Sequence, residues 1–534
     1  MTNRNALAAA AAALILVSPA AFAHDEEASA ADGRAPAKLG RVKFPTTCDA
    51  KVQPQFERGI ALLHSFWFPE ALKTFNEVLK ADPSCTIAYW GIGVNRLLNP
   101  FAGQPAEEVL LQGQAAVDKG QSLGAKSQRE RDYLDAIAAL YTHDKAPWRE
   151  RVLRYETAME QLAQRHPEDK EASIFYALAL NVASAPSDKT FAKQLKAAAI
   201  LEPIFAAQPD HPGAAHYLIH SYDYPAIAAK GLPAARSYAD IAPSAAHALH
   251  MPSHIFTRVG AWEDSIATNQ RSEATARTNN TPEEILHAID YQVYASLQLA
   301  QDAKAARGIE RAQAETARAE GRAGAYALAA GPVRYALERG DWRAAAQLAP
   351  RPSKFQYTDA TIFFARALGA ARSGDPAAAR KDIAELARLR DELAARKDNY
   401  WAGEVEVQRL AAEGWTLLAE RSNDAALALM RKSADIEDAS EKAPVTPGRV
   451  LPARELLGEM LLELKQPAQA LKEFEASAMR EPNRFRGYCG AALAATQTGD
   501  SAKARAYYAE LARLAAKGDP RPELQQAKLY LSRN

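Results

Sequence analysis

Cysteine and net charge are both scarce in this chain. Its 534 residues include only Cys48, Cys85 and Cys489, and no two of them form a CxxC pair. This spacing excludes the cysteine-based zinc and redox motifs. Lysine plus arginine and aspartate plus glutamate each number 65, so the formal net charge is zero. Because nucleic-acid binding favours a basic surface, we expect no nucleic-acid partner.

Long apolar runs and several catalytic motifs are also missing. Beyond residue 23 no stretch is apolar over the roughly 20 residues that a membrane helix needs, so we expect no membrane association once a leader is removed. The sequence has no phosphate loop and no serine nucleophile elbow. Two stretches with histidines four apart, "HYLIH" and "HMPSH", have Tyr217 and Met251 where a zincin has glutamate. The zincin mechanism is therefore excluded.

The first residues are typical of a secretory signal peptide. Arg4 supplies a positive charge, "ALAAAAAALILV" at 6–17 supplies a short apolar core, and "AFA" at 21–23 supplies small residues for cleavage. We therefore predict a signal peptide over residues 1–23 and a periplasmic or secreted bacterial protein. The alternative is an uncleaved N-terminal anchor. Residues 24–45 have the polar composition of a flexible segment.

Export would place the cysteines in an oxidising compartment, where disulfide bonds persist. Three pairings are possible, and we favour Cys48–Cys85 because these two cysteines are the closest in sequence, 37 residues apart. Such a bridge stabilises the fold by about 4 kcal/mol in the chain-entropy model. Cys489 then remains as a small buried residue.

Helical periodicity is nearly continuous and contains a repeat. Two stretches, "GIALLHSFWFPEALKTFNEVLKADP" and "LLGEMLLELKQPAQALKEFEASAMREP", share the same spacing of small, aromatic and proline residues. The shared positions are Gly59, Ala71, Phe75 and Pro83 in the first stretch, and Gly458, Ala470, Phe474 and Pro482 in the second. This spacing resembles the 34-residue tetratricopeptide repeat, with units that start at residues 52 and 451. Further units are indicated by turns and second helices at 260–269, 300–308, 340–350 and 499–511.

The resemblance implies an all-α fold, an α-solenoid in which helix hairpins stack into a right-handed superhelix with a concave groove. A change of composition at 349–360 divides it into an N-terminal solenoid, residues 46–348, and a C-terminal solenoid, residues 349–534. The Pro-rich loop 437–456 must interrupt the helices of the second solenoid. This loop is either a solvated connector held by salt bridges or a cap that supplies polar contacts to the groove. Its charged residues include Glu437, Asp438, Glu441, Lys442, Arg449 and Glu455.

Histidine is concentrated in one region. Residues 211–287 hold seven of the 11 histidines. His250 follows His216 by 34 residues, and His254 follows His220 by the same interval, which is the length of the repeat. Two consecutive units therefore place histidine at the same two positions.

The resemblance to the tetratricopeptide repeat also assigns these residues to a surface. In such proteins positions 2, 5, 9, 12 and 13 of each unit face the groove. These positions are filled by His247, His250 and His254 in one unit, by His287, Asp290 and Tyr294 in the next, and by His64 at position 13 of the first. We therefore expect the clustered histidines to face one groove.

Histidines four apart on a helix share one face, with Cβ atoms about 5–6 Å apart. His216 with His220, and His250 with His254, are therefore each suited to bind one metal ion. The predicted ligands are His216, His220, His247, His250, His254, His287 and Asp290. Such donors suit zinc, copper, iron or nickel, and six histidines also suit a pair of metals, as in coupled dicopper sites. The alternatives are a pH-sensitive or hydrogen-bonded histidine network and plain packing.

Two prolines affect this geometry. Pro212 stands where a helix starts, which puts His211 at the helix terminus. Pro252 removes a backbone hydrogen bond, so its helix either is kinked between His250 and His254 or begins at Pro252. The second alternative would leave His247 and His250 in a loop. Further candidates for ligands, bases or hydrogen-bonding groups are Asp223, Tyr217, Tyr222 and Tyr294.

Longer segments extend the resemblance to one group of bacterial tetratricopeptide proteins, exported or soluble. These segments include "HPGAAHYLIH", "HMPSHIFTRVGAW" and "LHAIDYQVYASLQ", and the resemblance spans most of the mature chain. It implies the repeat fold and no particular chemistry. We predict an exported repeat protein whose groove holds a transition-metal site, with a metal-dependent reaction left open. The rival function is a metal-free scaffold that binds a peptide, a protein or a small molecule in the groove.

Overall fold

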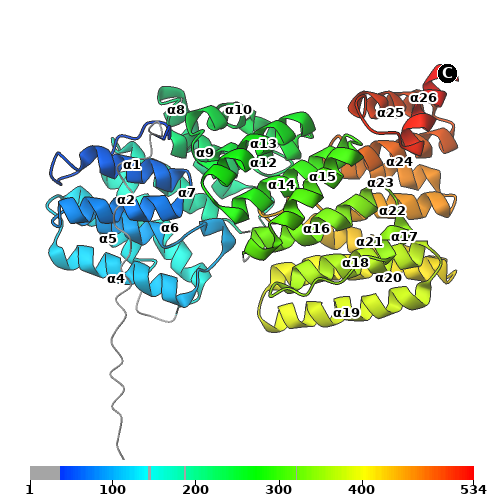
Figure 1. Ribbon diagram of the computed structural model, residues 1–534, viewed down its shortest axis with the longest axis horizontal. Helices are drawn as coiled ribbons and strands as arrows, with labels where there is room; N and C mark the ends of the chain where they lie inside the picture. Colours follow the sequence, from blue (N-terminus) through cyan, green and yellow to red (C-terminus); the bar gives the residue numbers. More distant parts are fainter. Residues whose placement is uncertain (1–36, 142–145, 186–187, 320, 534) are drawn as a thin grey trace, which may run out of the picture. The chain divides into compact units, whose positions relative to one another are not determined.

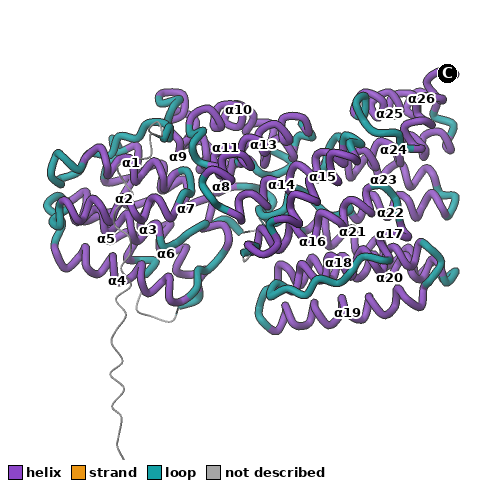
Figure 2. Tube along the Cα trace, in the orientation of Figure 1, coloured by secondary structure: helices purple, strands orange, loops and turns teal. Residues whose placement is uncertain are grey.

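The computed structural model describes residues 37–141, 146–185, 188–319 and 321–533. The signal peptide predicted over residues 1–23 lies outside the described residues. Lys38–Asn534 form one compact unit. Its described residues are helices joined by turns and loops, with no strand among them (Figures 1 and 2). The predicted all-α solenoid is thereby confirmed, whereas the division at residue 349 stays a prediction.

The first helices are α1 (Gln53–His64), α2 (Phe68–Ala81), α3 (Thr86–Asn95), η1 (Pro100–Ala102), α4 (Glu107–Leu123), α5 (Gln128–Ala138), α6 (Trp148–Arg165), α7 (Lys170–Val182) and α8 (Ala192–Ala207). The middle helices are α9 (Pro212–Tyr222), η2 (Ala228–Gly231), α10 (Leu232–Ile241), α11 (Ala246–His250), α12 (Pro252–Arg258), α13 (Trp262–Thr278), α14 (Pro282–Gln298), α15 (Asp302–Ala314), η3 (Thr316–Arg318), α16 (Arg322–Glu338) and α17 (Trp342–Ala346). The last helices are α18 (Gln356–Arg372), α19 (Pro376–Ala395), α20 (Asn399–Ala419), α21 (Asn423–Ala439), α22 (Ala453–Glu463), α23 (Pro467–Arg480), α24 (Phe485–Thr498), α25 (Ser501–Leu514) and α26 (Pro522–Arg533).

The repeat pattern is visible in the packing of successive helices. α1 packs on α2, and α22 packs on α23. A Cβ atom added to Gly59 would lie 2.7 Å from the ring of Phe75, and one added to Gly458 would lie 2.8 Å from the ring of Phe474. Both phenylalanines are buried. The glycine therefore lets the aromatic ring of the second helix approach the first helix, as the sequence spacing predicts for both units.

The turns that precede second helices use left-handed backbone conformations. Gly260, with φ of +68°, precedes α13, and Gly340, with φ of +65°, precedes α17. In the first unit Phe66 takes the same place with φ of +53°. A left-handed conformation costs a non-glycine residue about 1–2 kcal/mol. The backbone of Phe66 therefore takes a costly conformation, and its ring lies against histidines that are described below.

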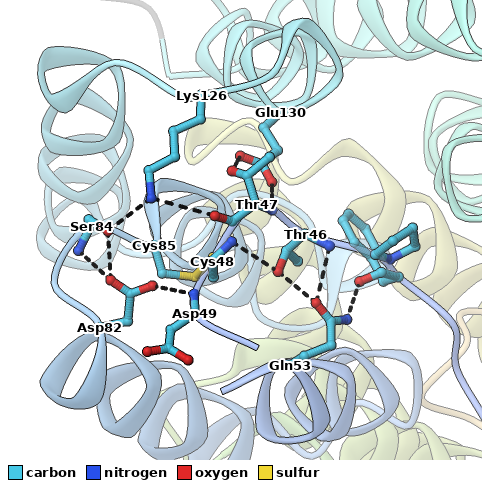
Figure 3. The surroundings of a disulfide bond; sticks show 12 residues. Thr46, Thr47, Cys48, Asp49, Gln53, Asp82, Ser84, Cys85, Lys126 and Glu130 are labelled. Atoms are coloured by element: carbon cyan, nitrogen blue, oxygen red, sulfur yellow. Dashed lines mark hydrogen bonds between the residues drawn. A yellow bond between two sulfur atoms is a disulfide. The ribbon is translucent and has the colours of Figure 1, made fainter. Parts of the chain in front are cut away.

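Cys48 and Cys85 form a disulfide bond, which confirms the predicted pairing (Figure 3). The bridge joins the segment before α1 to the start of α3. Next to it, the backbone N–H of Asp49 donates to Asp82 Oδ2 at 2.8 Å. The third cysteine, Cys489, is free and partly buried.

The end of the N-terminal segment is packed, although its composition predicts flexibility up to residue 45. Phe44 is fully buried, and its ring contacts those of Phe56, Trp90 and Tyr133. The backbone N–H of Arg41 donates to the Asp210 carbonyl at 3.0 Å. Burial of one large aromatic side chain thus outweighs the polar composition around it.

Two further features bear on the site. The helices are interrupted between α21 and α22, where the Pro-rich loop was predicted. Trp262 Nε1 at the start of α13 donates to the carbonyl of Asn483 at 2.7 Å, so residues more than 200 positions apart contact each other.

Among the described residues, no helix has both the length and the apolar composition that crossing a membrane requires.

Candidate metal centre

Four helices carry the six clustered histidines. α9 holds His216 and His220, α11 holds His247 and His250, α12 holds His254, and α14 holds His287. α9 begins at Pro212 with His211 as its N-cap, as predicted. Pro252 begins α12, so the helix does restart there, but His247 and His250 lie on the short helix α11 and not in a loop. The backbone of Met251, which joins α11 to α12, is also helical. His250 and His254 therefore keep the four-residue spacing of one helical face.

His216, His220 and His247 form the first group, and their ligand nitrogens all lie within 4.8 Å of one another. Nε2 of His220 lies 3.2 Å from Nε2 of His216. Nδ1 of His216 lies 2.6 Å from the carbonyl oxygen of His64. A carbonyl only accepts hydrogen bonds, so this Nδ1 carries the hydrogen and leaves the His216 Nε2 lone pair directed into the group.

His250, His254 and His287 form the second group, again with their ligand nitrogens within 4.8 Å of one another. Nε2 of His250 and Nε2 of His254 lie 3.1 Å apart. The ring of His287 is close to that of His250, with centroids 4.2 Å apart. The group therefore brings three imidazoles together from three helices.

In this second group the outer nitrogens of His250 and His254 are both hydrogen-bond donors. Nδ1 of His250 lies 2.7 Å from Asn269 Oδ1. The Asn269 amide nitrogen donates to the Ser265 carbonyl at 2.8 Å, which fixes the amide oxygen toward the histidine. Nδ1 of His254 donates to Asp223 Oδ2 at 2.9 Å. In the neutral rings the two Nε2 lone pairs therefore face each other across 3.1 Å.

The third histidine of each group has an unused ring nitrogen. No described residue makes a hydrogen bond with His247 Nε2 or with His287 Nδ1, although both atoms are buried. Buried polar atoms without partners are uncommon. Each group thus combines two Nε2 atoms that lie close together with one further buried ring nitrogen, that of His247 or His287.

The two groups are adjacent. Ring centroids are 6.3 Å apart between His220 and His254, and 6.2 Å apart between His247 and His250. The six imidazoles therefore form one continuous cluster with two halves.

Burial keeps the six rings neutral. It is the largest cause that lowers the pKa of every one of them, and charge repulsion from neighbouring histidines adds to it in all but His254. For His254 the carboxylate of Asp223 partly offsets the effect of burial. The pKa of His287 falls to about 3. At pH 7 the ring nitrogens are therefore free of the extra proton that would block metal binding.

Aromatic side chains cover the first group, so the histidines do not line an open groove. The ring of Phe66 lies 4.5 Å from that of His216 and 5.2 Å from that of His247, measured between centroids. The ring of Phe101 stacks on His220 at 3.9 Å. His216 is fully buried, and His220 is 8% exposed.

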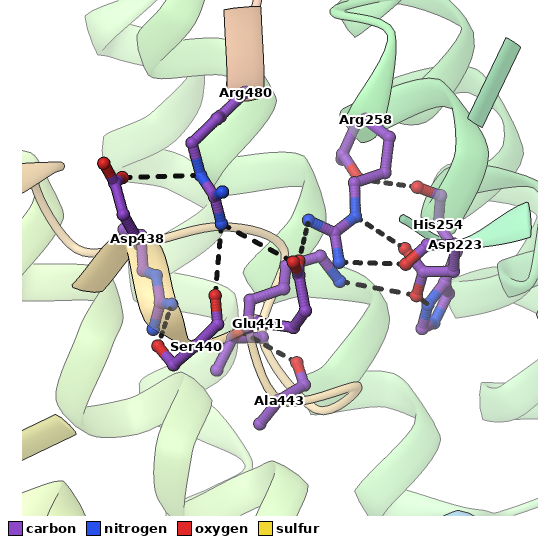
Figure 4. A network of polar contacts seen from close by, with 12 residues as sticks. Asp223, His254, Arg258, Asp438, Ser440, Glu441, Ala443 and Arg480 are labelled. Carbon is purple, nitrogen blue, oxygen red and sulfur yellow. Dashed lines mark hydrogen bonds and ion pairs between the residues drawn. The ribbon is translucent and has the colours of Figure 1, made fainter. Parts of the chain in front are cut away.

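The Pro-rich loop covers the second group, as one of the two sequence-based alternatives expects. Figure 4 shows Glu441 of this loop directed toward Arg258, which contacts Asp223. Lys442 Nζ lies 3.6 Å from Asp223 Oδ2. Burial lowers the pKa of Lys442 to about 8 against the attraction of Asp223, so its side chain is still mainly protonated at pH 7.

A third cluster, His64, Glu171 and His211, uses its nitrogens in hydrogen bonds. Nε2 of His64 and Nε2 of His211 contact the two oxygens of Glu171 at 2.9 and 2.7 Å. Nδ1 of His64 contacts the Tyr217 hydroxyl at 3.0 Å, and Nδ1 of His211 accepts from the backbone N–H of Ala214 at 3.2 Å. With every ring nitrogen paired, this cluster is a hydrogen-bonded support for the first group.

The remaining candidates from the sequence lie outside the two groups. Asp290 belongs to neither group, because its carboxylate pairs with the buried Arg334. The hydroxyl of Tyr222 donates to Glu202 at 2.5 Å, and that of Tyr294 accepts from Arg484 at 2.8 Å. Asp223 takes part as the hydrogen-bond acceptor of His254 and not as a member of a group.

Sequence reasoning missed several contributors. Asn269, Phe66 and Phe101 contact the cluster from other helices or turns, and no motif marks them. Tyr291 was a detectable candidate, because it follows His287 by four residues on α14; its hydroxyl lies 3.4 Å from His254 Nε2.

These features define a TPR-like helical repeat protein with a buried histidine cluster. No known family profile matches the sequence, and no curated protein is significantly similar to it. The human IFIT1 dimer with m7Gppp-AAAA is similar over 81% of this chain and 90% of that chain, at 12% identity and a TM-score of 0.37. The APC/C hetero-tetramer Cut9–Hcn1 is similar over 90% of this chain and 76% of that chain, at 12% identity and a TM-score of 0.35. Because these similarities are low, the assignment of the fold rests on the helix pairs and their glycine–phenylalanine packing.

Proposed function

We propose that this chain is an exported metal-binding repeat protein in which each three-histidine group holds one transition-metal ion. The observation that carries the proposal is the pair of Nε2 atoms of His250 and His254, 3.1 Å apart. Because the outer nitrogens of both rings donate hydrogen bonds, two lone pairs face each other. A cation between them, a proton or a metal ion, would relieve their repulsion.

The burial of the rings favours the metal ion. Burial lowers the pKa of both His250 and His254, so a bridging proton is disfavoured at neutral pH. Two nitrogens bound to one tetrahedral metal at about 2.0–2.1 Å lie about 3.3–3.4 Å apart. The separations of 3.1 and 3.2 Å in the two groups are close to this value.

The ligand type selects the class of metal. Imidazole suits zinc, copper and iron, whereas magnesium and calcium require oxygen ligands. Three protein ligands leave a coordination position open, as in catalytic zinc sites. The adjacency of the two groups supports a pair of ions, an arrangement that can bind one ligand between two metals.

Export is part of the proposal. The signal-peptide pattern at residues 1–23 motivates it, and the Cys48–Cys85 disulfide is compatible with an oxidising compartment. Mass analysis of the protein from the periplasm should find an N-terminus after residue 23. An intact N-terminus on all of the protein would contradict export by cleavage.

Elemental analysis tests the metal centre. After loading with zinc, copper or iron, the full chain should retain two ions of at least one of these metals. His254→Ala should retain about one, because the first group is intact. His166→Ala is the control, since His166 contacts Asp132 and lies outside both groups. Substoichiometric metal with all three ions, or equal metal in the two variants, would contradict the proposal and favour the metal-free scaffold.

A further inference from the structure

The Tyr217 hydroxyl lies at one end of a buried hydrogen-bonded chain. Its oxygen lies 3.0 Å from Nδ1 of His64, and Nε2 of His64 lies 2.9 Å from Oε2 of Glu171. Nε2 of His211 lies 2.7 Å from the other carboxylate oxygen of Glu171. Each of these four residues is at most 2% exposed. A hydroxyl, an imidazole and a carboxylate joined in this order form an arrangement in which the imidazole can take the hydroxyl proton.

The direction of each hydrogen bond in this chain follows from the carboxylate. An ionised carboxylate only accepts hydrogen bonds. Burial opposes the ionisation of Glu171, but its contacts with His211 and His64 lower its pKa to about 2, so His64 Nε2 carries a hydrogen. Because burial lowers the pKa of His64, this ring is neutral and its Nδ1 has a lone pair. The Tyr217 hydroxyl therefore donates to His64 Nδ1.

This chain provides a place for the phenolic proton when Tyr217 loses an electron. An oxidised phenol becomes a neutral radical only when it also releases that proton. His64 Nδ1 is 3.0 Å from the hydroxyl and can receive it, a role that suits histidine. The carboxylate of Glu171 would stabilise the imidazolium that forms, as the aspartate of a hydrolase triad does.

Tyr217 is also close to the first histidine group. It follows His216 directly in α9, and the ring centroids of these two residues lie 5.3 Å apart. The backbone carbonyl of His64 accepts a hydrogen bond from His216 Nδ1 at 2.6 Å. His64 therefore contacts the group through its backbone and Tyr217 through its ring, so an ion in the group and the phenol would be neighbours.

The proton acceptor distinguishes Tyr217 from two other buried tyrosines beside the histidines. The ring of Tyr238 lies 5.2 Å from that of His216, but its hydroxyl donates to the backbone carbonyl of His64 at 3.4 Å. A backbone carbonyl is far too weak a base to take up a proton. The Tyr291 hydroxyl lies 3.4 Å from His254 Nε2, a nitrogen that a bound metal ion would occupy. Of these three tyrosines, Tyr217 is the one with a free base.

We propose that Tyr217 is a redox-active tyrosine that supplies one electron to the ion of the first histidine group while His64 takes its proton. The O–H bond of Tyr217 breaks and an N–H bond forms at His64 Nδ1, which leaves a neutral tyrosyl radical, an imidazolium beside Glu171 and an ion reduced by one electron. The oxidant is thus a copper or iron ion in its higher oxidation state, because zinc has no redox chemistry. This inference rests on the proposed metal centre and narrows the choice of metal.

Electron paramagnetic resonance tests this inference. The full chain is loaded with copper or with iron, whichever it retains, treated with hydrogen peroxide as the oxidant of the bound ion, and frozen. A tyrosyl radical signal should form in the parent chain and disappear in Tyr217→Phe, with the metal content unchanged. Tyr238→Phe is the matched control and should keep the signal. His64→Gln should also lose it, because it removes the base but keeps the backbone carbonyl that contacts His216.

The outcomes separate the two proposals. Retention of no metal ion overturns the metal centre and this inference with it, whereas retention of zinc alone overturns this inference and leaves the centre standing. Bound copper or iron without a tyrosyl signal, or an equal signal in Tyr217→Phe and the parent chain, overturns this inference alone. An equal loss of signal in Tyr238→Phe would assign the effect to packing around His216 and also overturn it.

A second variant covers a failure of His64→Gln to take up metal. Glu171→Gln removes the charge that stabilises the imidazolium, so the radical should decay faster than in the parent chain. An unchanged lifetime in Glu171→Gln would overturn the inference.

Discussion

At the scale of single residues, the hydrogen bond at the outer ring nitrogen of a histidine determines whether its inner nitrogen has a lone pair for a metal ion. His216, His250 and His254 donate through Nδ1 to a carbonyl, an amide oxygen and a carboxylate. This leaves Nε2 without a hydrogen in the neutral ring. Such outer partners commonly orient metal-binding histidines and contribute about 10–100-fold to metal affinity.

Asn269 provides a test of this effect. Asn269→Ala removes the acceptor for His250, so the affinity of the second group for metal should fall about 10–100-fold, as measured by competition with a chromophoric chelator. Asn269→Asp keeps an acceptor and should retain most of the affinity. The buried Asn181, which bonds to Ser221, is the control. An equal loss in Asn181→Ala would show that any buried asparagine has this effect.

Proton binding should destabilise the metal-free protein below neutral pH. The histidine cluster has folded-state pKa values below the unfolded value of about 6.5, and that of His287 falls to about 3. Between the folded-state and unfolded-state pKa values, the unfolded chain binds more protons than the folded chain. The histidine contribution to the free energy of unfolding is therefore fully present above about pH 6.5 and is lost as the pH falls below it. Each histidine can contribute a slope of about 1.4 kcal/mol per pH unit.

Urea unfolding of metal-free protein from pH 7.5 to pH 5 measures this slope. The free energy of unfolding should decrease steadily below about pH 6.5, and less steeply in His287→Gln. A constant free energy of unfolding across this range would mean that the rings are not buried in the neutral form.

At the scale of helices, the contact between a glycine and an aromatic ring fixes how closely two helices pack. Gly59→Ala should lower the free energy of unfolding by about 1–3 kcal/mol, the usual cost of overpacking, because the new Cβ would lie 2.7 Å from Phe75. Gly403→Ala is the control within α20, where no atom lies within 4 Å of the added Cβ. It should be neutral or stabilise by up to about 1 kcal/mol. Similar losses in both variants, measured by urea unfolding, would contradict the packing argument.

Local sequence signals were sufficient for several helices. Proline predicted the start at Pro212, and the predicted turn-and-helix segments 260–269 and 499–511 contain the starts of α13 and α25. The segment around Pro252 was harder, because a proline can either kink a helix or begin one. In the structure Pro252 begins a new helix, α12, and the helical backbone of Met251 joins it to α11. The segment therefore combines features of a kink and of a new start.

At the scale of the whole molecule, the sequence found the six histidines and predicted how four of them divide. It paired His216 with His220 and His250 with His254, and the structure places each pair in one group. It did not assign His247 and His287 to these pairs. The repeat arithmetic placed Asp290 in the site, but the buried Arg334 holds it elsewhere. Repeat spacing reports equivalent positions, whereas side-chain direction also depends on neighbours from other units.

Contacts across long sequence separations were beyond the sequence argument. The His64 carbonyl reaches His216 from 152 positions away, and the Thr446 carbonyl reaches Tyr291 from 155 positions away. The loop 437–456 had two possible roles until its partners were known. Its charges suggested salt bridges. In the structure Glu441 pairs with Arg258 and Lys442 pairs with Asp223, and these ion pairs hold the loop beside the cluster.

The central claim is that two three-histidine groups each hold a transition-metal ion. Anomalous diffraction at the absorption edge of the bound metal, from crystals of the loaded full chain, tests it most directly. The account predicts two peaks, one about 2.0–2.1 Å from nitrogens of His216, His220 and His247, and one at the same distance from nitrogens of His250, His254 and His287. The absence of a peak at either group in stoichiometrically loaded protein, or a peak at His64, Glu171 and His211 in their place, would contradict it.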